Sequence, residues 1–596
     1  MQWDASVNAL INMVQAGRLS RRQFIERMSA AGFAGSTIAM LLAACGGSSS
    51  PTSSSNAAVM PPGGSVPTFV ATAVPTIAAV SSGTNTGLVK APEPEPKRGG
   101  TVRIASNWVT TSYDIHQGGS SGALCHAYNN LIRLNLVDGL RTIIPELAES
   151  WQIAPDGLMY TFKLRSAVQF HDGTPLSSDD VVATYLRIIK PPQGIISVQR
   201  DFFTMLNNVE AIDPLTVKFT LNAPSPIFLL LLTGLFNAIY AKKTLEANNY
   251  DLRKVQIAPG TGPFTFVSYK ENELWTYARN PNYWNKELPY ADSVELLHVP
   301  GFSDRGTAVL TGRADIGWNV AKETWDEGQK HPDTIKGNLV AQFGCYQVIV
   351  NTKKKPFDDP RVRRALFLAL SRQGLSQAFA TQEQIRLTRW IPYGSDFATP
   401  PDMLATLPGY RQDKTQDLME AKKLLADAGV PNGIPGVDFL AASLPAHSEV
   451  LAPAVQDQLK QALGIETKIR VQERAFLVEE EKKGNFTLVL DTPGGPIADF
   501  SPIANAYLKT GGSQNYGGYS NPQVDNLLKR SDVEQDHAKR ADLLNQLQDT
   551  LDQDPPWLFI GYTTQLPMWR TYVKGLALEQ RIIQEGGRVD TVWLDK

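Results

Sequence analysis

The chain has 596 residues, with 57 Lys and Arg against 59 Asp and Glu, a formal net charge of -2 and only three cysteines. The balanced charge lacks the excess of Lys and Arg that favours nucleic-acid binding, and three cysteines are too few for a disulfide-built scaffold. A hydrophobic content of 42% is typical of globular proteins, and the length suggests about two to four domains.

The first 44 residues have the features of an export signal. Arg21 and Arg22 precede an apolar stretch over residues 30–44, which ends in LAA before Cys45. This stretch is shorter than the roughly 20 residues that a permanent membrane-spanning helix needs. The paired arginines resemble the twin-arginine export motif, and LAAC resembles the lipobox of bacterial lipoproteins. The resemblance implies cleavage before Cys45 and its lipidation; the alternative is a buried helix followed by an ordinary cysteine.

The segment after Cys45 differs in composition from the rest of the chain. Residues 46–89 contain no charged side chain and are rich in Ser, Thr, Pro, Gly and Ala. Such a segment cannot bury enough apolar surface to offset the entropy lost on ordering. We therefore predict a signal peptide over residues 1–44 and a flexible, lipid-anchored linker over residues 45–97.

Strands and helices alternate along the remaining body. The apolar run at residues 226–241 is too short for a second membrane span and predicts a core helix. This mixture favours an α/β architecture. Strands are predicted at residues 101–105, 158–165, 217–221, 264–267, 468–471, 487–490 and 557–562. Further helices are predicted at residues 123–134, 181–189, 360–370, 415–428 and 536–551.

Short phrases spread over the body match one family when they are taken in order. They are PELAESW (145–151), DGLMYTFKLR (156–165), FHDGTP (170–175), GTGPF (260–264), RNPNYW (279–284), LTGRAD (310–315), NTKKKPFDDPRVR (351–363), YSNPQVD (519–525) and VKG (573–575). Together they resemble the signature of the family 5 extracytoplasmic solute-binding proteins, which serve ABC importers of peptides, dipeptides and nickel.

The resemblance implies a fold and a division into domains. The fold is α/β, of the hinged, two-lobed type II periplasmic-binding-protein (Venus-flytrap) class, with an additional inserted α+β domain. Lobe I then combines residues 98–137, 257–353 and 561–596, the additional domain covers residues 138–256, and lobe II covers residues 354–560. A ligand would lie between the lobes and close them by hinge bending.

Asp499 is the leading candidate for a ligand contact. In peptide-binding relatives an aspartate in a phrase like ADY pairs with the amino terminus of the ligand, and ADFSP at residues 498–502 resembles that phrase. The alternative is a loop carboxylate that caps a helix beginning near Ser501. Many relatives have a Trp shortly before this phrase, where this chain has GGPI at residues 494–497. We therefore expect a reshaped pocket.

Four aromatic residues, Trp108, Tyr113, Tyr346 and Trp390, complete the candidate ligand contacts. Aromatic side chains suit a cleft because they offer a large rigid area, and Tyr and Trp add a polar group. They suit a core equally well. We expect no catalytic residue and no cofactor.

Cys125 and Cys345 are the thiols that remain if Cys45 carries a lipid. We expect two buried free thiols; a disulfide between them is the alternative in an oxidising compartment. Cys125 with His116 and His126 matches no standard zinc spacing, so no metal site is predicted.

These observations predict a lipoprotein held in the periplasm or at the outer face of the cytoplasmic membrane. It would capture a small solute, with a short peptide as the first candidate, and deliver it to an ABC permease as a monomer. A receptor of the same fold for an oligosaccharide or a nickel complex is one alternative. Another is a secreted serine hydrolase, because GGSSG at residues 118–122 places Ser120 in a G-x-S-x-G pattern. The preceding TTSYDIHQ is no convincing strand, which counts against the hydrolase.

Overall fold

The computed structural model describes residues 95–110, 112–135, 142–379, 385–393, 395–495, 497, 499–576 and 588–596. They belong to one structural unit, residues 75–596. The predicted signal peptide and most of the linker, including Arg21, Arg22 and Cys45, lie outside the described residues. In the described part of the chain, no helix combines the length and the hydrophobicity of a membrane span.

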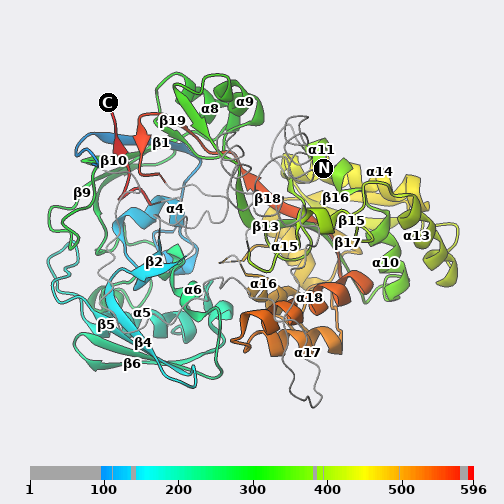
Figure 1. Ribbon diagram of the computed structural model, residues 1–596, viewed down its shortest axis with the longest axis horizontal. Helices are drawn as coiled ribbons and strands as arrows, with labels where there is room; N and C mark the ends of the chain where they lie inside the picture. The colour runs from blue at the N-terminus through cyan, green and yellow to red at the C-terminus, as the bar shows by residue number, and fades with distance from the viewer. Residues whose placement is uncertain are drawn as a thin grey trace, which may run out of the picture. The chain divides into compact units, whose positions relative to one another are not determined.

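One mixed sheet forms the centre of lobe I. Within the described ranges it has seven strands, in the order β12-β19-β11-β1-β10-β9-β8. Figure 1 labels β19, β1, β10 and β9 of this sheet. β1 lies parallel to β10 on one side and to β11 on the other, and its Val102 and Ile104 are buried in the core. The elements of this lobe are β1 (Thr101–Ser106), α4 (Ser121–Leu124), β8 (Phe264–Lys270), β9 (Leu274–Arg279), β10 (Ser293–His298), α8 (Phe302–Leu310), β11 (Ile316–Gly317), α9 (Lys322–Gln329), β12 (Ile335–Gly337), β19 (Met568–Arg570), β20 (Val573–Lys574) and β21 (Trp593–Leu594).

An antiparallel sheet in the order β4-β5-β7-β6 forms the core of a further domain, together with helix α5. The helix begins with a capping box, in which the backbone N–H of Ser177 donates to Asp180 Oδ2 at 2.8 Å. The elements are β2 (Ile132–Leu134), β3 (Ile143–Pro145), β4 (Ala148–Ile153), β5 (Met159–Leu164), α5 (Ser178–Ile189), β6 (Leu206–Asp213), β7 (Thr216–Leu221), α6 (Phe228–Leu232) and α7 (Lys242–Ala247).

Two predicted helices of this region are wrong in extent. Residues 123–134 form the end of α4, a 3-10 turn and β2 instead of one helix. Asn130 explains the change, because its side-chain amide donates to the carbonyls of Thr233 and Gly234 at 3.0 and 2.8 Å and fixes this segment against a distant one. The run 226–241 is mostly buried as expected, but it forms α6 and a separate 3-10 turn on either side of Gly234.

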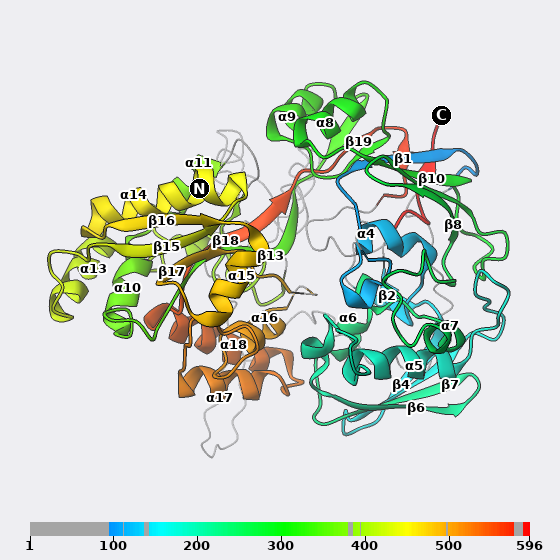
Figure 2. The ribbon, with the colours of Figure 1, turned by 180° about the vertical axis from the view of Figure 1, so that it is seen from behind.

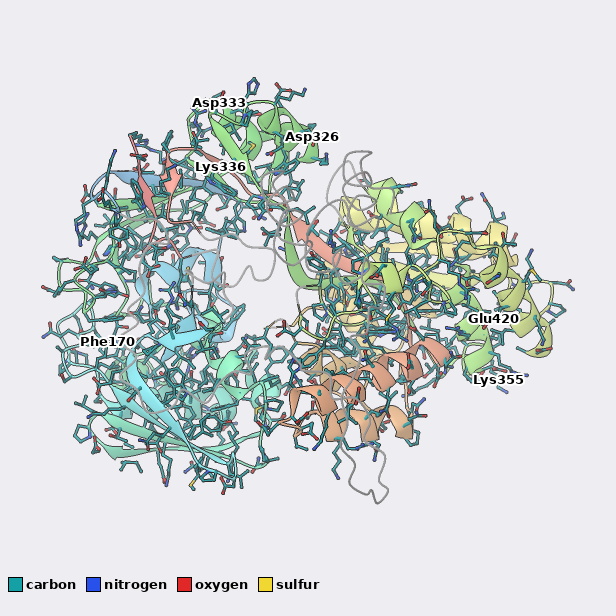
Figure 3. All side chains as sticks on the ribbon, in the orientation of Figure 1. Phe170, Asp326, Asp333, Lys336, Lys355 and Glu420 are labelled. Carbon is teal, nitrogen blue, oxygen red and sulfur yellow. The ribbon has the colours of Figure 1, made fainter. Side chains whose placement is uncertain are left out.

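The second large sheet forms the centre of lobe II, with the strand order β14-β18-β13-β17-β15-β16 in the described part of the chain. β15 lies parallel to β16 and to β17. Exposed charged side chains such as Lys355 and Glu420 project from this lobe (Figure 3). The elements are β13 (Val340–Val350), α10 (Pro360–Ala369), α11 (Arg372–Phe379), β14 (Ile385–Arg386), α12 (Pro401–Leu404), α13 (Thr415–Asp427), β15 (Val437–Ala442), α14 (Ala452–Leu463), β16 (Thr467–Gln472), α15 (Arg474–Lys483), β17 (Leu488–Asp491), α16 (Ser501–Tyr507), α17 (Pro522–Ser531), α18 (His537–Gln553) and β18 (Trp557–Gln565).

The chain passes between the two large sheets through β13 and β18, which lie side by side (Figure 2). Their pairing begins at Val340 opposite Gln565 and continues to Ile349 opposite Trp557. Both strands belong to the sheet of lobe II. The predicted lobe boundaries at residues 353 and 560 fall after β13 and inside β18.

Candidate functional site

In lobe I, two tryptophans cover the carboxyl ends of parallel strands. Trp108 follows β1 and Trp318 follows β11, and their ring centroids lie 5.3 Å apart. Gly122 of α4 allows this packing, since a Cβ at that position would lie 2.5 Å from the ring of Trp108. The carboxyl ends of parallel strands are where ligands bind in open α/β sheets, so this face is the candidate ligand surface of lobe I.

In lobe II, apolar side chains are exposed at the corresponding strand ends. Leu444 follows β15, Val471 is the penultimate residue of β16, and Phe476 lies in the first turn of α15. Phe476 is 66% exposed, and the other two are nearly half exposed. Large apolar side chains grouped at one exposed edge mark a binding surface more often than isolated ones do.

A buried polar cluster lies beside these apolar residues. Asp491, the last residue of β17, accepts an ion-paired hydrogen bond from the Arg474 guanidinium at the start of α15. Gln347 of β13 lies directly opposite Asp491 in the ladder, and the Cys345 thiol donates to Gln347 Oε1 at 3.2 Å. Glu481 of α15 is 1% exposed. Burial, followed by the charge of Asp491, raises the pKa of Glu481 to about 8.

His447 extends the cluster toward Tyr346. The His447 Nε2 and Thr492 Oγ1 atoms lie 2.9 Å apart, and the ring centroid of His447 lies 5.7 Å from that of Tyr346. Burial lowers the pKa of His447 to about 4, so the ring is neutral at physiological pH. Tyr346, predicted as a ligand contact, thus lies on β13 next to this polar cluster.

Asp499 is buried and already paired within lobe II. Its two carboxylate oxygens accept from Arg540 Nη1 and Nη2 at 2.8 and 3.0 Å, and Oδ1 also accepts from the backbone N–H of Ser501 at 2.9 Å. Burial alone would raise the pKa of Asp499, but Arg540 lowers it below its usual range. These contacts are those of the capping alternative, and the three donors occupy three of the roughly four lone-pair sites of the carboxylate.

Trp390 lies in the core of lobe II, whereas Tyr113 is partly buried and packs against the core of lobe I. Trp390 is 0% exposed, and its indole N–H donates to Asp552 Oδ1 at 2.8 Å. Tyr113 packs edge-on against Tyr269 and Trp275, which belong to β8 and β9. These positions fit the core interpretation of the two aromatic residues.

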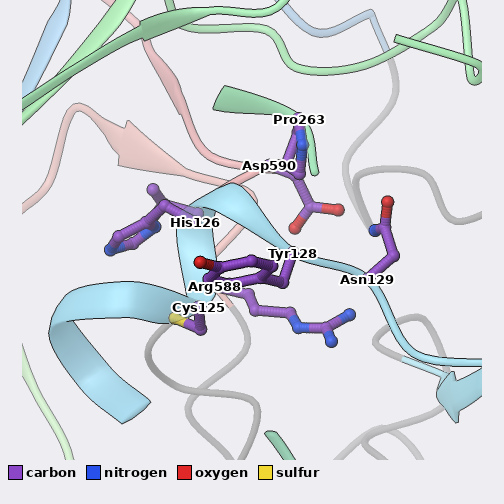
Figure 4. A pocket seen from close by; sticks show the side chains of 8 residues that line it. Cys125, His126, Tyr128, Asn129, Pro263, Arg588 and Asp590 are labelled. Atoms are coloured by element: carbon purple, nitrogen blue, oxygen red, sulfur yellow. The ribbon is translucent and has the colours of Figure 1, made fainter. Parts of the chain in front are cut away.

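The two body thiols are free and buried, as expected. Cys125 lines a narrow pocket with His126, Arg588 and Asp590 (Figure 4). His116 is held elsewhere, by the carbonyl of Ala238 at 3.0 Å. Among the residues that the structure describes, no group of three His, Cys, Asp or Glu side chains could hold a metal ion.

Ser120 does not lie in a nucleophile elbow. It occupies the N-cap position of the short helix α4, and residues 112–119 before it form bends and a 3-10 turn. The strand that a G-x-S-x-G serine requires before its turn is therefore replaced by irregular backbone.

Sequence reasoning missed the polar cluster of Asp491, Arg474, Glu481, Gln347 and His447. One signal was available. Arg474 and Glu481 are seven residues apart in a helix, which places them on the same face. The pairing of β13 with β17, which brings Gln347 to Asp491, had no signal in the sequence.

A family model for bacterial extracellular solute-binding proteins, family 5 Middle, matches residues 142–515. Heme-binding protein A of Haemophilus influenzae is 29% identical over 75% of this chain and 84% of its own length. Dipeptide-binding protein DppE of Bacillus subtilis is 25% identical over 78% of this chain and 87% of its own length. Glutathione-binding protein GsiB of Escherichia coli is 27% identical over 77% of this chain and 87% of its own length.

Solved structures agree with the fold. The periplasmic binding protein DppA of Helicobacter pylori, in complex with the peptide STSA, superposes with a TM-score of 0.69 at 25% identity, covering 84% of this chain and 99% of its own. The fold is thus the predicted two-lobed type II class of binding protein, and these relatives are receptors, not enzymes. The chain belongs to family 5 of the bacterial extracellular solute-binding proteins.

Proposed function

We propose that this protein is an ABC-importer receptor that binds a short peptide between the strand ends of lobes I and II and delivers it to a membrane permease. The observation that carries the proposal is the lobe II face, where Phe476, Leu444 and Val471 are exposed beside a buried polar cluster. Apolar pockets with a few fixed polar groups suit peptides, which combine apolar side chains with a polar backbone. The peptide held by DppA and the names of DppE and GsiB support this class of ligand.

Within this proposal, Trp108 and Tyr346 contact the ligand from the two sides of the hinge. Asp499 binds the ligand amino terminus through the one lone pair, on Oδ2, that Arg540 and Ser501 leave unused. Closure would bend the two crossing strands β13 and β18, and the free energy of ligand binding would shift the protein toward the closed state.

A thermal-shift screen of the full-length protein tests the ligand class. We expect short peptides to raise Tm, since a ligand at 100 times its Kd adds about 2.7 kcal/mol to the stability of the folded state. The same screen includes oligosaccharides, heme and nickel salts as alternative ligands. A shift with any of these and none with peptides would overturn the peptide proposal.

We also infer that Cys45 carries a lipid that holds the protein at a membrane surface, after export directed by Arg21 and Arg22. The order of the arginines, the apolar stretch and the LAAC sequence supports this inference. We expect Cys45→Ala to release the protein from the membrane fraction into the soluble fraction. Retention of the variant in membranes would contradict the anchor.

A further inference from the structure

At the lobe II strand ends, two buried carboxyl groups lie near one guanidinium, that of Arg474, whose side chain is 43% exposed. The carboxyl groups are those of Asp491 and Glu481, and the guanidinium contacts Asp491. Glu481 Oε1 is buried and, among the described residues, has no hydrogen-bond partner. A buried acceptor without a partner costs free energy, so such a group needs an explanation in terms of what satisfies it.

Three elements, β13, α15 and β17, contribute polar groups to this cluster. Arg474 and Glu481 share one face of α15, and helical side chains lean toward the N-terminus, which turns Glu481 toward Arg474 and the end of β17. Gln347 lies directly opposite Asp491 and therefore on the same face of the sheet. Gln347 is 0% exposed, and its Nε2 is a second buried atom for which the described residues provide no partner.

The positive charge of Arg474 acts to lower the pKa of Glu481, but burial and the charge of Asp491 outweigh it. Tyr507 of α16 and Tyr516 lie within electrostatic reach, and burial raises the pKa of both phenols, so they are neutral at physiological pH. Lys482 is exposed and forms its ion pair with Glu479 at 2.9 Å. The cluster thus offers an acceptor at Glu481 and a donor at Gln347 to a group that is not part of lobe II.

We propose that Glu481 and Asp491 form a subsite for a positively charged side chain of the ligand, a primary ammonium or a guanidinium, while Gln347 Nε2 donates to a neighbouring ligand carbonyl. This subsite rests on the function proposed above and narrows the ligand class to peptides that carry a basic residue. A peptide supplies both groups at once, because every side chain is flanked by backbone carbonyls.

Binding at this subsite exchanges a proton for the cationic group. Without ligand, Glu481 holds a proton up to about pH 8, because burial and the charge of Asp491 raise its pKa. The incoming cation stabilises the ionised form, so the proton is released to solvent when the ligand binds. Affinity for a basic peptide should therefore rise with pH up to about 8 and level off above it.

Calorimetric titration of the full-length protein tests the subsite. The probes are tripeptides of alanine with one Lys or one Leu at each position, so that the α-ammonium is common to both sets. We expect the best Lys peptide to bind roughly tenfold tighter than its Leu counterpart at pH 8.5, and this ratio to shrink at pH 6.5. Titrations in buffers of different ionisation enthalpy should show proton release with the Lys peptide alone.

Two variants separate this role from a structural one. Glu481→Gln keeps the shape of the side chain and should lower the Lys-to-Leu affinity ratio roughly tenfold. Glu479→Gln changes an exposed residue of the same helix and should leave the Lys-to-Leu affinity ratio unchanged.

Two results would overturn the subsite but not the proposed function: Leu peptides that bind the wild type as well as Lys peptides do, or a Lys-to-Leu affinity ratio that is the same in Glu481→Gln as in the wild type. Equal weakening of both sets by Glu481→Gln would assign Glu481 to folding instead. If no peptide binds, the proposed function fails and the subsite with it.

Discussion

Two clusters of buried acids differ in the number and the burial of the arginines beside them, since Arg474 of the second cluster is 43% exposed. In the first, Arg133 lies 2.7 Å from Asp590, and Arg588 lies 2.5 Å from Glu146, so two acids face two guanidinium groups. The second, at the lobe II strand ends, has two acids and the single guanidinium of Arg474.

The two clusters differ in role: the first is structural, and the second is the proposed binding subsite. The balanced cluster connects the C-terminal segment to residues 133 and 146, more than 400 positions earlier, and Arg133 lowers the pKa of Asp590 against the effect of burial. Such a network fixes the path of distant segments and has no charge left for a ligand. The second cluster retains a protonated acid at neutral pH, and in our proposal a cationic group of the ligand displaces that proton. The number of arginines beside the acids, rather than the burial of the acids, therefore distinguishes the two clusters.

The largest expected effect comes from unbalancing the first cluster. Glu146→Ala would leave two buried arginines with one acid, and it would remove the acceptor for Asn129 and for the backbone of Asn130. We expect a loss of about 3–5 kcal/mol in the free energy of unfolding, measured by urea denaturation of the full-length protein.

An exposed glutamate nearby provides the matched control for Glu146→Ala. The Glu149 side chain is 42% exposed and lies 3.7 Å from Lys163. Glu149→Ala should change the free energy of unfolding by less than about 1 kcal/mol. If the two variants lose similar stability, the balanced cluster is not a scaffold.

The sequence predicted those elements whose signals are local. Ser177 and Asp180 cap α5, and the strand over 158–165 and the helices over 360–370 and 415–428 form within one or two residues of the expected positions. Capping groups, alternation and helical periodicity act between near neighbours, so the sequence carries them directly.

The sequence does not predict features that depend on contacts between residues far apart in the chain. Asn130 interrupts the expected helix because its partners are Thr233 and Gly234. Trp390 was a candidate contact, yet Asp552 and the surrounding rings hold it in the core. The polar cluster depends on the pairing of β13 with β17, which joins residues more than 140 positions apart. Composition and periodicity contain no information about such pairings.

An effect that appears only at high pH is expected when the second cluster loses its protonated acid. The pKa of Glu481 is about 8 in the folded protein against 4.5 ordinarily, so its contribution to stability is full below pH 4.5 and is lost progressively as the pH rises to about 8. Glu481→Gln has no charge to desolvate, and it should exceed the wild type by up to about 4–5 kcal/mol at pH 9 and by little at pH 5. Denaturation at pH 5, 7 and 9 measures this difference, with Glu479→Gln as the control that should follow the wild type. A difference that does not change with pH would mean that Glu481 is ionised from pH 5 to pH 9. A further positive group would then have to stabilise its carboxylate, and the two clusters would not differ in the way described above.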